Sequence, residues 1–456
     1  MKLVFSRFLT LLIALVLCFS SSTVLASCDN QQHPDDSDIE SESVTEPEET
    51  DPEETDPIVT DLDLAKFTIV KPYKDTYGEK DVTTFLFNSI KETYGVELPI
   101  KDDYLDEGAS FDPEAYEILV GRTAYAESTA AAEGLGKKDY VVKVDGNKIV
   151  ILGGLGSATQ SAAEYFLANC IAKEDNALNV SVELNHNYKH EYKYAMSDIT
   201  ICSLNLRTAD NPNKNTQSIR EPLIADFVAT YKPDSIGTQE CEVFWRIRLD
   251  TVLVGYERAM SVPTGVTTKN YIWYNPETLT KIDSGVFWLS ETPDKESKGF
   301  GSKYYISCCW AIFEVKATGA RYVHFNAHLD AYNADIREKE IEVLLDRVQP
   351  FLDEGYAVLM TGDYNCTIDS NPAKRVLETG FISSQLEAPK TSTLGTFNSF
   401  KDRSEREYTG PIDFIFANEN ATPNEVEVID KWPDANGVKG FMSDHNAVFG
   451  RLTIYG

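Results

Sequence analysis

The sequence lacks the features that mark several large classes of protein. Only eight of its 456 residues are cysteines, with no CxxC pair and no zinc-site spacing. Beyond residue 28 it has no heptad pattern, no internal repeat and no apolar run long enough to cross a membrane. Basic residues are scarce: 42 Lys and Arg stand against 73 Asp and Glu, a formal net charge of −31. Because non-specific nucleic-acid binding relies on a basic face, the composition argues against that function.

The first 27 residues have the pattern of an export signal. Lys2 and Arg7 precede an apolar run at 8–19, which is too short to favour a membrane-spanning helix. The sequence LASC (25–28) resembles the bacterial lipoprotein box, which implies cleavage before Cys28 and lipidation of its thiol. The alternative is an ordinary signal peptide followed by an unmodified cysteine. We therefore expect an extracytoplasmic protein that is anchored to the bacterial cell membrane through Cys28.

Negative charge is concentrated directly after this signal. Residues 29–65 contain 15 Asp and Glu, no Lys or Arg, and several prolines. A segment of this composition cannot bury an apolar core, and repulsion between its charges extends it. The predicted organisation is a lipoprotein signal peptide (1–27), an acidic disordered tether (28–65), a small α/β domain (66–190) and a larger α/β domain (194–456).

The small domain shows alternating strand and helix patterns. Apolar residues at 82–94 recur with helical spacing, and Asp145-Gly146 predicts a turn between two strands. The stretch GGLGSA (153–158) lacks the Lys-Ser/Thr of a phosphate-binding P-loop, so we interpret it as a tight strand-to-helix turn. In EILVGRT, VDGNKIVILGG and the following helix, the domain resembles the non-catalytic α/β domains that precede catalytic domains in some glycoside hydrolases.

Strand and helix patterns also alternate throughout 194–456, which is typical of an α/β fold. Polar side chains stand at the ends of six of its strand-like runs. These residues are Asn205, Glu240, His328, Asp363 with Asn365, Asp413, and Asp444 with His445. One polar strand end has little meaning, but six indicate one convergent site at a sheet edge. Carboxylates suit Mg²⁺, and imidazoles exchange protons near neutral pH.

The motifs SLN, QE, FWLSETP, NAHLD, GDYN, IDFIF and SDHNAV occur in this order along the region. In these motifs the region resembles the endonuclease/exonuclease/phosphatase superfamily, which includes DNase I-like nucleases. The resemblance covers essentially all of 194–456. It implies a two-sheet α/β sandwich flanked by helices, preceded here by the small α/β domain. It also implies a hydrolase of phosphoric esters that uses Mg²⁺ or Mn²⁺.

The resemblance assigns roles around the metal ion. Glu240 is expected to be the principal metal ligand, and Asn205 and Asp444 are expected to complete the shell of metal and water. Asp363 and Asn365 are expected to orient the attacking water and a phosphoryl oxygen. These roles follow from the positions of the residues in the SLN, QE, GDYN and SDH motifs.

The resemblance also assigns roles toward the phosphate. His445 is expected to contact the phosphate or transfer a proton, with Asp413 fixing its tautomer. His328 is expected to be the second imidazole, which stabilises charge or protonates the leaving oxygen. Substrate contacts are expected from Tyr274, Arg337 and the Asn of GDYN. For Arg337, an ion pair that only holds a loop is the alternative.

The sequence departs from the family pattern in two places. Nuclease-like members carry a Glu that supports the first His, whereas 262–274 contains no acid. Many members carry an Arg in the stretch that corresponds to 304–310, where this chain has none. With the acidic composition, we expect a small-molecule ester, lipid headgroup or sugar phosphate as substrate. The alternatives are a secreted nuclease, a non-catalytic protein that binds a glycan or partner, and a chain whose main role belongs to 66–190.

Overall fold

The computed structural model describes residues 62–75, 79–174, 177–208, 215–260, 268–392, 394–406 and 410–455. The predicted signal peptide, the lipidation at Cys28 and nearly all of the tether lie outside these described residues. Within them, no helix is both long and apolar enough to cross a membrane. The described strands form one set of sheets in an N-terminal region (62–188) and another in a C-terminal region (197–454).

The N-terminal region has a six-stranded sheet in the order β3-β2-β4-β6-β5-β9 and a three-stranded sheet in the order β1-β8-β7. The strands are β1 (Leu62–Asp63), β2 (Thr68–Lys71), β3 (Ile100–Asp102), β4 (Glu117–Val120), β5 (Tyr140–Asp145), β6 (Lys148–Gly153), β7 (Ala172–Glu174), β8 (Ala177–Val180) and β9 (Asn185–Tyr188). The helices are η2 (Leu64–Lys66), α2 (Glu79–Tyr94), α3 (Ala126–Ala132) and α4 (Gly156–Asn169).

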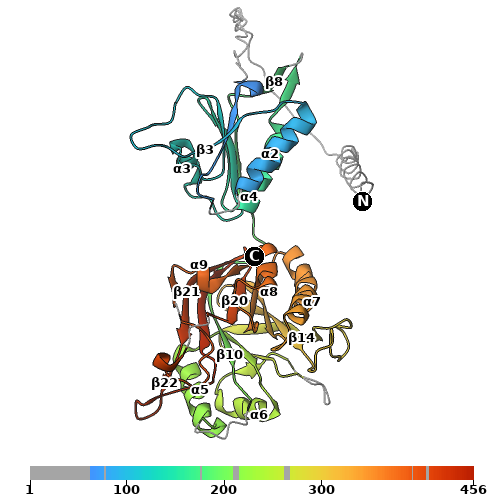
Figure 1. Ribbon diagram of the computed structural model, residues 1–456, viewed down its shortest axis with the longest axis vertical. Coiled ribbons are helices and arrows are strands. Elements are labelled where there is room, and N and C mark those ends of the chain that lie inside the picture. Colours follow the sequence, from blue (N-terminus) through green and yellow to red (C-terminus); the bar gives the residue numbers. More distant parts are fainter. Residues whose placement is uncertain are drawn as a thin grey trace, which may run out of the picture. The chain divides into compact units, whose positions relative to one another are not determined.

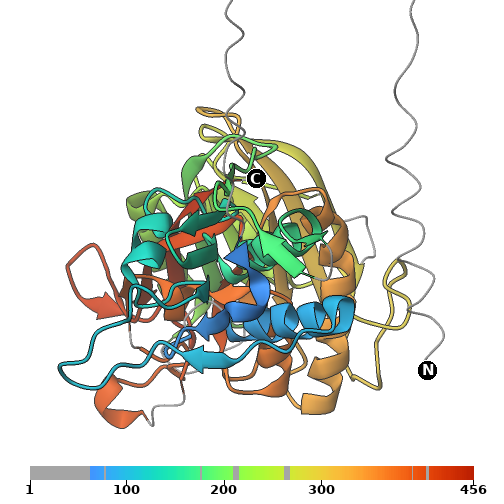
Figure 2. The same ribbon diagram turned by 90° about the horizontal axis from the view of Figure 1, so that it is seen from above.

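Apolar patterning explains how these helices pack. The buried face of α2, with Val82, Leu86 and Ile90, and the buried face of α4 join one core against the larger sheet, while α3 packs on the other side (Figure 1). Figure 2 shows α2 in blue from above. The predicted turn is confirmed, because β5 and β6 pair up to Asp145 and Lys148. The stretch 153–158 is also a strand-to-helix turn, and a Cβ on its second glycine would lie 1.9 Å from a backbone oxygen.

The C-terminal region has two large sheets, in the orders β12-β13-β11-β10-β24-β21-β19 and β14-β15-β16-β17-β20-β18, and a small sheet β22-β23. The strands are β10 (Ser197–Asn205), β11 (Ser235–Gln239), β12 (Glu257–Arg258), β13 (Tyr271–Tyr274), β14 (Leu279–Trp288), β15 (Ser307–Val315), β16 (Arg321–His328), β17 (Ala357–Asp363), β18 (Ile382–Ser383), β19 (Lys390–Thr391), β20 (Asp413–Ala417), β21 (Ala421–Ile429), β22 (Trp432–Pro433), β23 (Lys439–Gly440) and β24 (Ala447–Ile454). The helices are α5 (Gln217–Tyr231), α6 (Val243–Val252), α7 (Ala334–Asp353), α8 (Asn371–Glu378), α9 (Ser384–Glu387) and η3 (Arg403–Glu405).

The two large sheets pack face to face. Their shared core includes Ile201 and Val448 from one sheet and Phe313 and Leu359 from the other. The outer face of the first sheet packs against α5 and α6, and that of the second packs against α7 and α8 (Figure 1). The predicted two-sheet α/β sandwich flanked by helices is therefore confirmed. Each layer follows from burying apolar faces of strands and helices against one another.

Strand direction decides which residues share an edge of the sandwich. In the first sheet β10 and β11 are parallel, with Asn205 beside Gln239. In the second sheet β16 and β17 are parallel, with His328 beside Asp363, and β20 places Asp413 opposite Asp363. The polar strand ends therefore meet at one edge, as the sequence predicts.

Candidate active site

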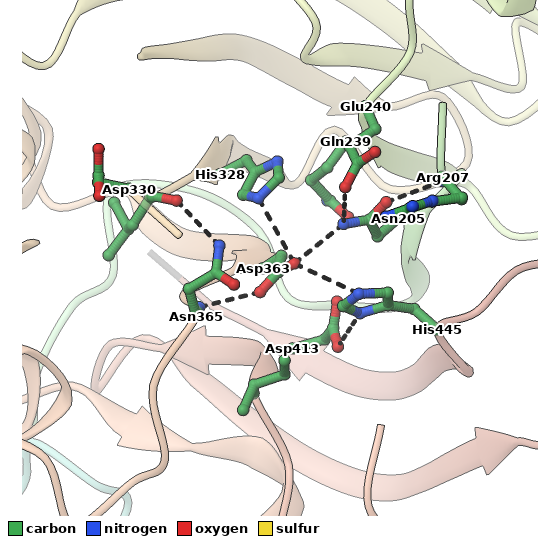
Figure 3. A network of polar contacts seen from close by, with 12 residues as sticks. Asn205, Arg207, Gln239, Glu240, His328, Asp330, Asp363, Asn365, Asp413 and His445 are labelled. Atoms are coloured by element: carbon green, nitrogen blue, oxygen red, sulfur yellow. Dashed lines mark hydrogen bonds and ion pairs between the residues drawn. The ribbon is translucent and has the colours of Figure 1, made fainter. Parts of the chain in front are cut away.

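Asp363 lies at the centre of the polar residues at this edge (Figure 3). It is 1% exposed. Its Oδ2 accepts a hydrogen bond from Asn205 Nδ2 at 2.9 Å and lies 3.5 Å from Nε2 of His328 and 3.7 Å from Nε2 of His445. Its Oδ1 accepts from the backbone N–H of Asn365 at 2.9 Å. One carboxylate therefore holds side chains from both sheets around a single point.

His445 is held by a second buried carboxylate. Its Nδ1 lies 2.9 Å from Oδ2 of Asp413, which is 1% exposed. Burial alone would lower the pKa of the His445 imidazole, but the carboxylates of Asp413 and Asp363 outweigh burial and raise that pKa to about 10. The two carboxylates therefore favour the protonated form of the ring, whose Nε2 lies on the side of Asp363 and the site.

Asp363, Asp413 and His445 form a buried cluster whose potential ligand atoms lie within 4.8 Å of one another. Such a group can hold a metal ion only if the imidazole is neutral with a free lone pair. Here Nδ1 contacts Asp413, and the neighbouring carboxylates favour the protonated ring. The cluster therefore suits proton transfer and phosphate contact better than metal binding.

The residues predicted to bind metal form a neighbouring group. Glu240 Oε1 lies 3.4 Å from Asn205 Nδ2, and its Oε2 accepts from the N–H of Thr208. Asp444 is 5% exposed, and burial raises its pKa, with the Glu240 carboxylate acting in the same direction. Arg207 lies 3.5 Å from Asp444 and is 46% exposed, so it balances little of this charge. The two carboxylates, whose negative charge His445 and Arg207 offset only in part, fit a hard divalent cation, and the amide of Asn205 lies beside Glu240.

The backbone around the site is strained. Arg207, Glu240 and Asn365 have φ angles of 54°, 51° and 49°. Residues other than glycine rarely adopt this left-handed conformation, which costs about 1–3 kcal/mol each and persists only where surrounding contacts enforce it. Side chains supply some of these contacts, since Asn205 Oδ1 accepts from the N–H of Arg207 at 2.9 Å. Strain at three points around one site is typical of a functional constellation.

Two arginines of the site were missed from the sequence. Arg207 lies two residues after SLN and brings a guanidinium to Asp444, although the stretch 304–310 has none. Arg220 is fully buried and donates to the carbonyls of Leu206 and Thr208, and its guanidinium stacks on the ring of Trp245. It therefore supports the loop that carries Arg207. Its position on the apolar face of a predicted helix is the signal that could have identified it.

Tyr274 is a wrong prediction. Because β13 runs antiparallel to β11, Tyr274 lies opposite Ser235, at the far end of β11 from Gln239. The ring packs in the core against Phe313, and the hydroxyl donates to Glu257. It cannot contact a substrate bound at the site edge.

Arg337 holds a loop in this structure. Its guanidinium donates to the carbonyl of Asp330 at 2.7 Å. The alternative considered in the sequence was an ion pair that holds a loop; the observed contact holds the loop through a backbone carbonyl, and contact with substrate stays a prediction. Of the stretch 262–274, which contains no acid, residues 262–267 lie outside the described residues. In the described part, His328 has Asp363 as its carboxylate.

Buried polar residues beside the site are structural. His324 lies between Ser235 and Thr361 inside the sandwich, and burial lowers its pKa to about 3. Asn326 joins the two sheets through Gln239 and backbone carbonyls. Both residues therefore stabilise the fold.

Comparison with known proteins agrees with this geometry. The family model described as "Endonuclease/Exonuclease/phosphatase family" matches residues 203–445. Two solved structures from Bacteroides thetaiotaomicron are similar at 25% identity. An endonuclease/exonuclease/phosphatase family protein has a TM-score of 0.52, with 57% of this chain and 99% of that chain covered. A mannosyl-6-phosphatase has a TM-score of 0.51, with 56% and 99% covered.

Among curated proteins, an uncharacterized protein of Acanthamoeba polyphaga mimivirus is 26% identical over 220 residues. The match covers 44% of this chain and 79% of the viral protein. All three similarities cover about half of the chain, and the family match contains every predicted metal and catalytic residue.

Proposed function

The chain belongs to the endonuclease/exonuclease/phosphatase family, whose members hydrolyse phosphoric esters, and on this premise we propose that it is a hydrolase dependent on Mg²⁺ or Mn²⁺. The observation that carries the proposal is the geometry around Asp363. An acidic group that suits a divalent cation stands on one side of it, and the imidazolium of His445 stands on the other. Phosphoric ester hydrolysis needs positive charge on both sides of a phosphoryl group.

Glu240, Asp444 and the amide oxygen of Asn205 are the residues that would hold the cation. When bound, a divalent cation supplies a Lewis acid that offsets phosphoryl charge and lowers the pKa of water. The backbone N–H of Thr208 fixes the Glu240 carboxylate at 2.9 Å, so the ligand is oriented in advance.

The remaining residues position water and protons. Asp363 orients the attacking water with one carboxylate oxygen, while the N–H of Asn365 fixes the other. Asp413 keeps Nδ1 of His445 protonated, so that Nε2–H donates to a phosphoryl oxygen. His328, on the opposite side of Asp363, supplies the second imidazole near the leaving oxygen.

The proposed substrate is a small phosphoric ester, such as a sugar phosphate, a phosphorylated small molecule or a lipid headgroup. The similarity to a mannosyl-6-phosphatase supports this class, as does the net charge of −31, which disfavours a polyanion. The sequence LASC supports a location on the outer face of the bacterial cell membrane, and the region 66–190 is proposed to be an accessory domain.

The test is turnover of a substrate panel in Mg²⁺ or Mn²⁺ by the chain lacking its first 27 residues. The panel contains mannose 6-phosphate, glycerol 2-phosphate, bis-p-nitrophenyl phosphate, inositol phosphates, sphingomyelin, and single- and double-stranded DNA. We expect turnover that EDTA abolishes and that Glu240→Gln lowers strongly. Glu242→Gln is the matched control, because Glu242 only pairs with Lys269 at the surface.

Turnover of no member of the panel, or turnover that Glu240→Gln leaves unchanged, would overturn the proposal. DNA as the best substrate would replace it with a secreted nuclease. Binding of a glycan without turnover would replace it with a non-catalytic role.

A further inference from the structure

Two tyrosines form an exposed aromatic pair in the C-terminal region. The rings of Tyr304 and Tyr332 are stacked, with centroids 6.1 Å apart and planes 24° apart. Tyr332 is 79% exposed and Tyr304 is 48% exposed. Neither ring contributes to a core cluster. Two neighbouring aromatic rings held at the surface are a typical feature of binding sites rather than of packing.

One buried carboxylate holds both loops that carry these rings. Asp330 is 3% exposed. Its Oδ1 accepts from the N–H of Tyr332 at 2.8 Å, and its Oδ2 accepts from Oγ of Ser302 at 2.7 Å. Ser302 in turn accepts from the N–H of Tyr304. Hydrogen bonds to a buried side chain therefore hold the backbone that carries the two exposed rings.

Two further hydrogen bonds hold the loop that carries Tyr332. The N–H of Asp330 donates to the buried carboxyl of Glu340 at 2.8 Å, and burial raises the pKa of Glu340 to about 8. Arg337 donates to the Asp330 carbonyl. Rigid backbone beneath an exposed ring lowers the entropy that a ligand must remove on binding.

The pair is linked to the candidate active site through the loop that carries Tyr332. Tyr332 follows His328 by four residues, and the intervening Leu329 is bonded to both the carbonyl of Asp363 and the side chain of Asn365. The loop that carries Tyr332 is therefore bonded directly to two residues of the candidate site.

We infer that Tyr332 and Tyr304 form a subsite for the pyranose ring of a sugar phosphate whose phosphate is bound beside Asp363. This inference rests on the proposed function. A pyranose has an apolar C–H face, which stacks on an aromatic ring, and hydroxyl groups at its edge, which pair with phenol hydroxyls. Tyrosine offers both surfaces on a side chain with little rotational freedom.

The experiment compares a ring-bearing with a ring-less ester. We expect Tyr332→Ala and Tyr304→Ala to raise KM for mannose 6-phosphate about five- to tenfold, in line with one lost aromatic contact, and to leave glycerol 2-phosphate turnover unchanged. Tyr305→Ala is the matched control, because Tyr305 is 41% exposed beside the pair but outside the stack. It should affect neither substrate.

Equal losses on both esters would overturn the subsite, because they would mean a general distortion of the site. A larger loss on adenosine 5′-monophosphate than on mannose 6-phosphate would replace the sugar by a nucleobase and overturn the assignment.

A calorimetric titration with mannose 6-phosphate in EDTA distinguishes failure of the subsite from failure of the proposed function. If no ester is hydrolysed, weaker binding by Tyr332→Ala and Tyr304→Ala than by Tyr305→Ala still supports the subsite. Equal binding by all three variants overturns it.

Discussion

Each region of the molecule buries a cluster of charged side chains, but the two clusters balance charge differently. In the N-terminal region, Lys148 and Glu117 are each 1% exposed and form an ion pair at 2.9 Å. Tyr125 and Lys101 also contact Glu117. In the C-terminal region, Asp363, Asp413, Asp444 and Glu240 lie near one another, and among the described residues His445, Arg207 and the buried Arg220 are the cationic groups that face them.

The pKa directions follow from this difference. Burial alone would raise the pKa of Glu117, but Lys101, Lys148 and Tyr125 outweigh it and lower that pKa. Burial raises the pKa of Asp444, and the cationic neighbours do not offset it. A buried carboxylate that is paired with buried cations needs no ligand to neutralise its charge. Buried carboxylates without enough cationic partners, beside strained backbone, indicate a ligand-binding site. Charge imbalance, rather than burial of charge, therefore distinguishes the functional cluster.

The largest expected effect comes from breaking the balanced cluster. Lys148→Met leaves Glu117 buried beside fewer cations, so we expect the free energy of unfolding to fall by about 3–5 kcal/mol. The turnover number of the folded enzyme should not change. Denaturant unfolding and steady-state kinetics on the same preparation measure both quantities. A fall in turnover without a loss of stability would contradict the comparison.

A substitution in the C-terminal cluster should lower activity without lowering the free energy of unfolding. Asp444→Asn removes one of two neighbouring carboxylates, so we expect activity to fall about 10²–10³-fold, as for loss of several kcal/mol of charge stabilisation. In EDTA, the free energy of unfolding should stay equal or rise, because the raised pKa of Asp444 makes its ionised form unfavourable at neutral pH. Marked destabilisation in EDTA would show that Asp444 is a structural residue.

Lowering the pH should weaken the ion pairs of the N-terminal cluster. The folded pKa of Glu117 lies below its ordinary value of 4.5, so its stabilisation is present above pH 4.5 and is lost as pH falls through the folded pKa. We expect the stability difference between the native chain and Glu117→Gln to shrink below pH 4.5. Urea unfolding from pH 7 to pH 3 measures it. A difference that grows on acidification would contradict the assignment.

The smallest effect is expected at the surface. Arg375 pairs with Glu342 at 2.6 Å, with side chains 43% and 52% exposed. Exposed pairs gain little because water screens them. Arg375→Ala should therefore leave both the unfolding midpoint and the turnover unchanged within error. A clear shift in either would mean that charge pairing outside the two buried clusters also matters.

Much of the candidate site could be predicted from the sequence because strand ends are visible in it. Apolar runs that stop at Asn205, Glu240, His328 and Asp363 indicate polar groups at an edge, and their types indicate metal and proton chemistry. Helix faces and the turn at Asp145-Gly146 are equally local, since periodicity and turn chemistry depend on neighbours in the chain.

Strand order and direction could not be predicted in this way. Tyr274 shows the limit, because only the antiparallel direction of β13 places it at the far end of the sheet. Arg220 stands on the apolar face of a predicted helix, but its support of the Arg207 loop depends on that loop folding over the helix.

The sequence by itself determined the α/β class, the apolar faces and the residue types of the site, because each depends on short-range periodicity. Only the tertiary structure decided that Asn205 and Asp363, 158 residues apart, share a hydrogen bond, and that one carboxylate, Asp330, holds two tyrosine-bearing loops. These contacts depend on which strands become neighbours and in which direction they run. That choice comes from packing the two sheets as a whole.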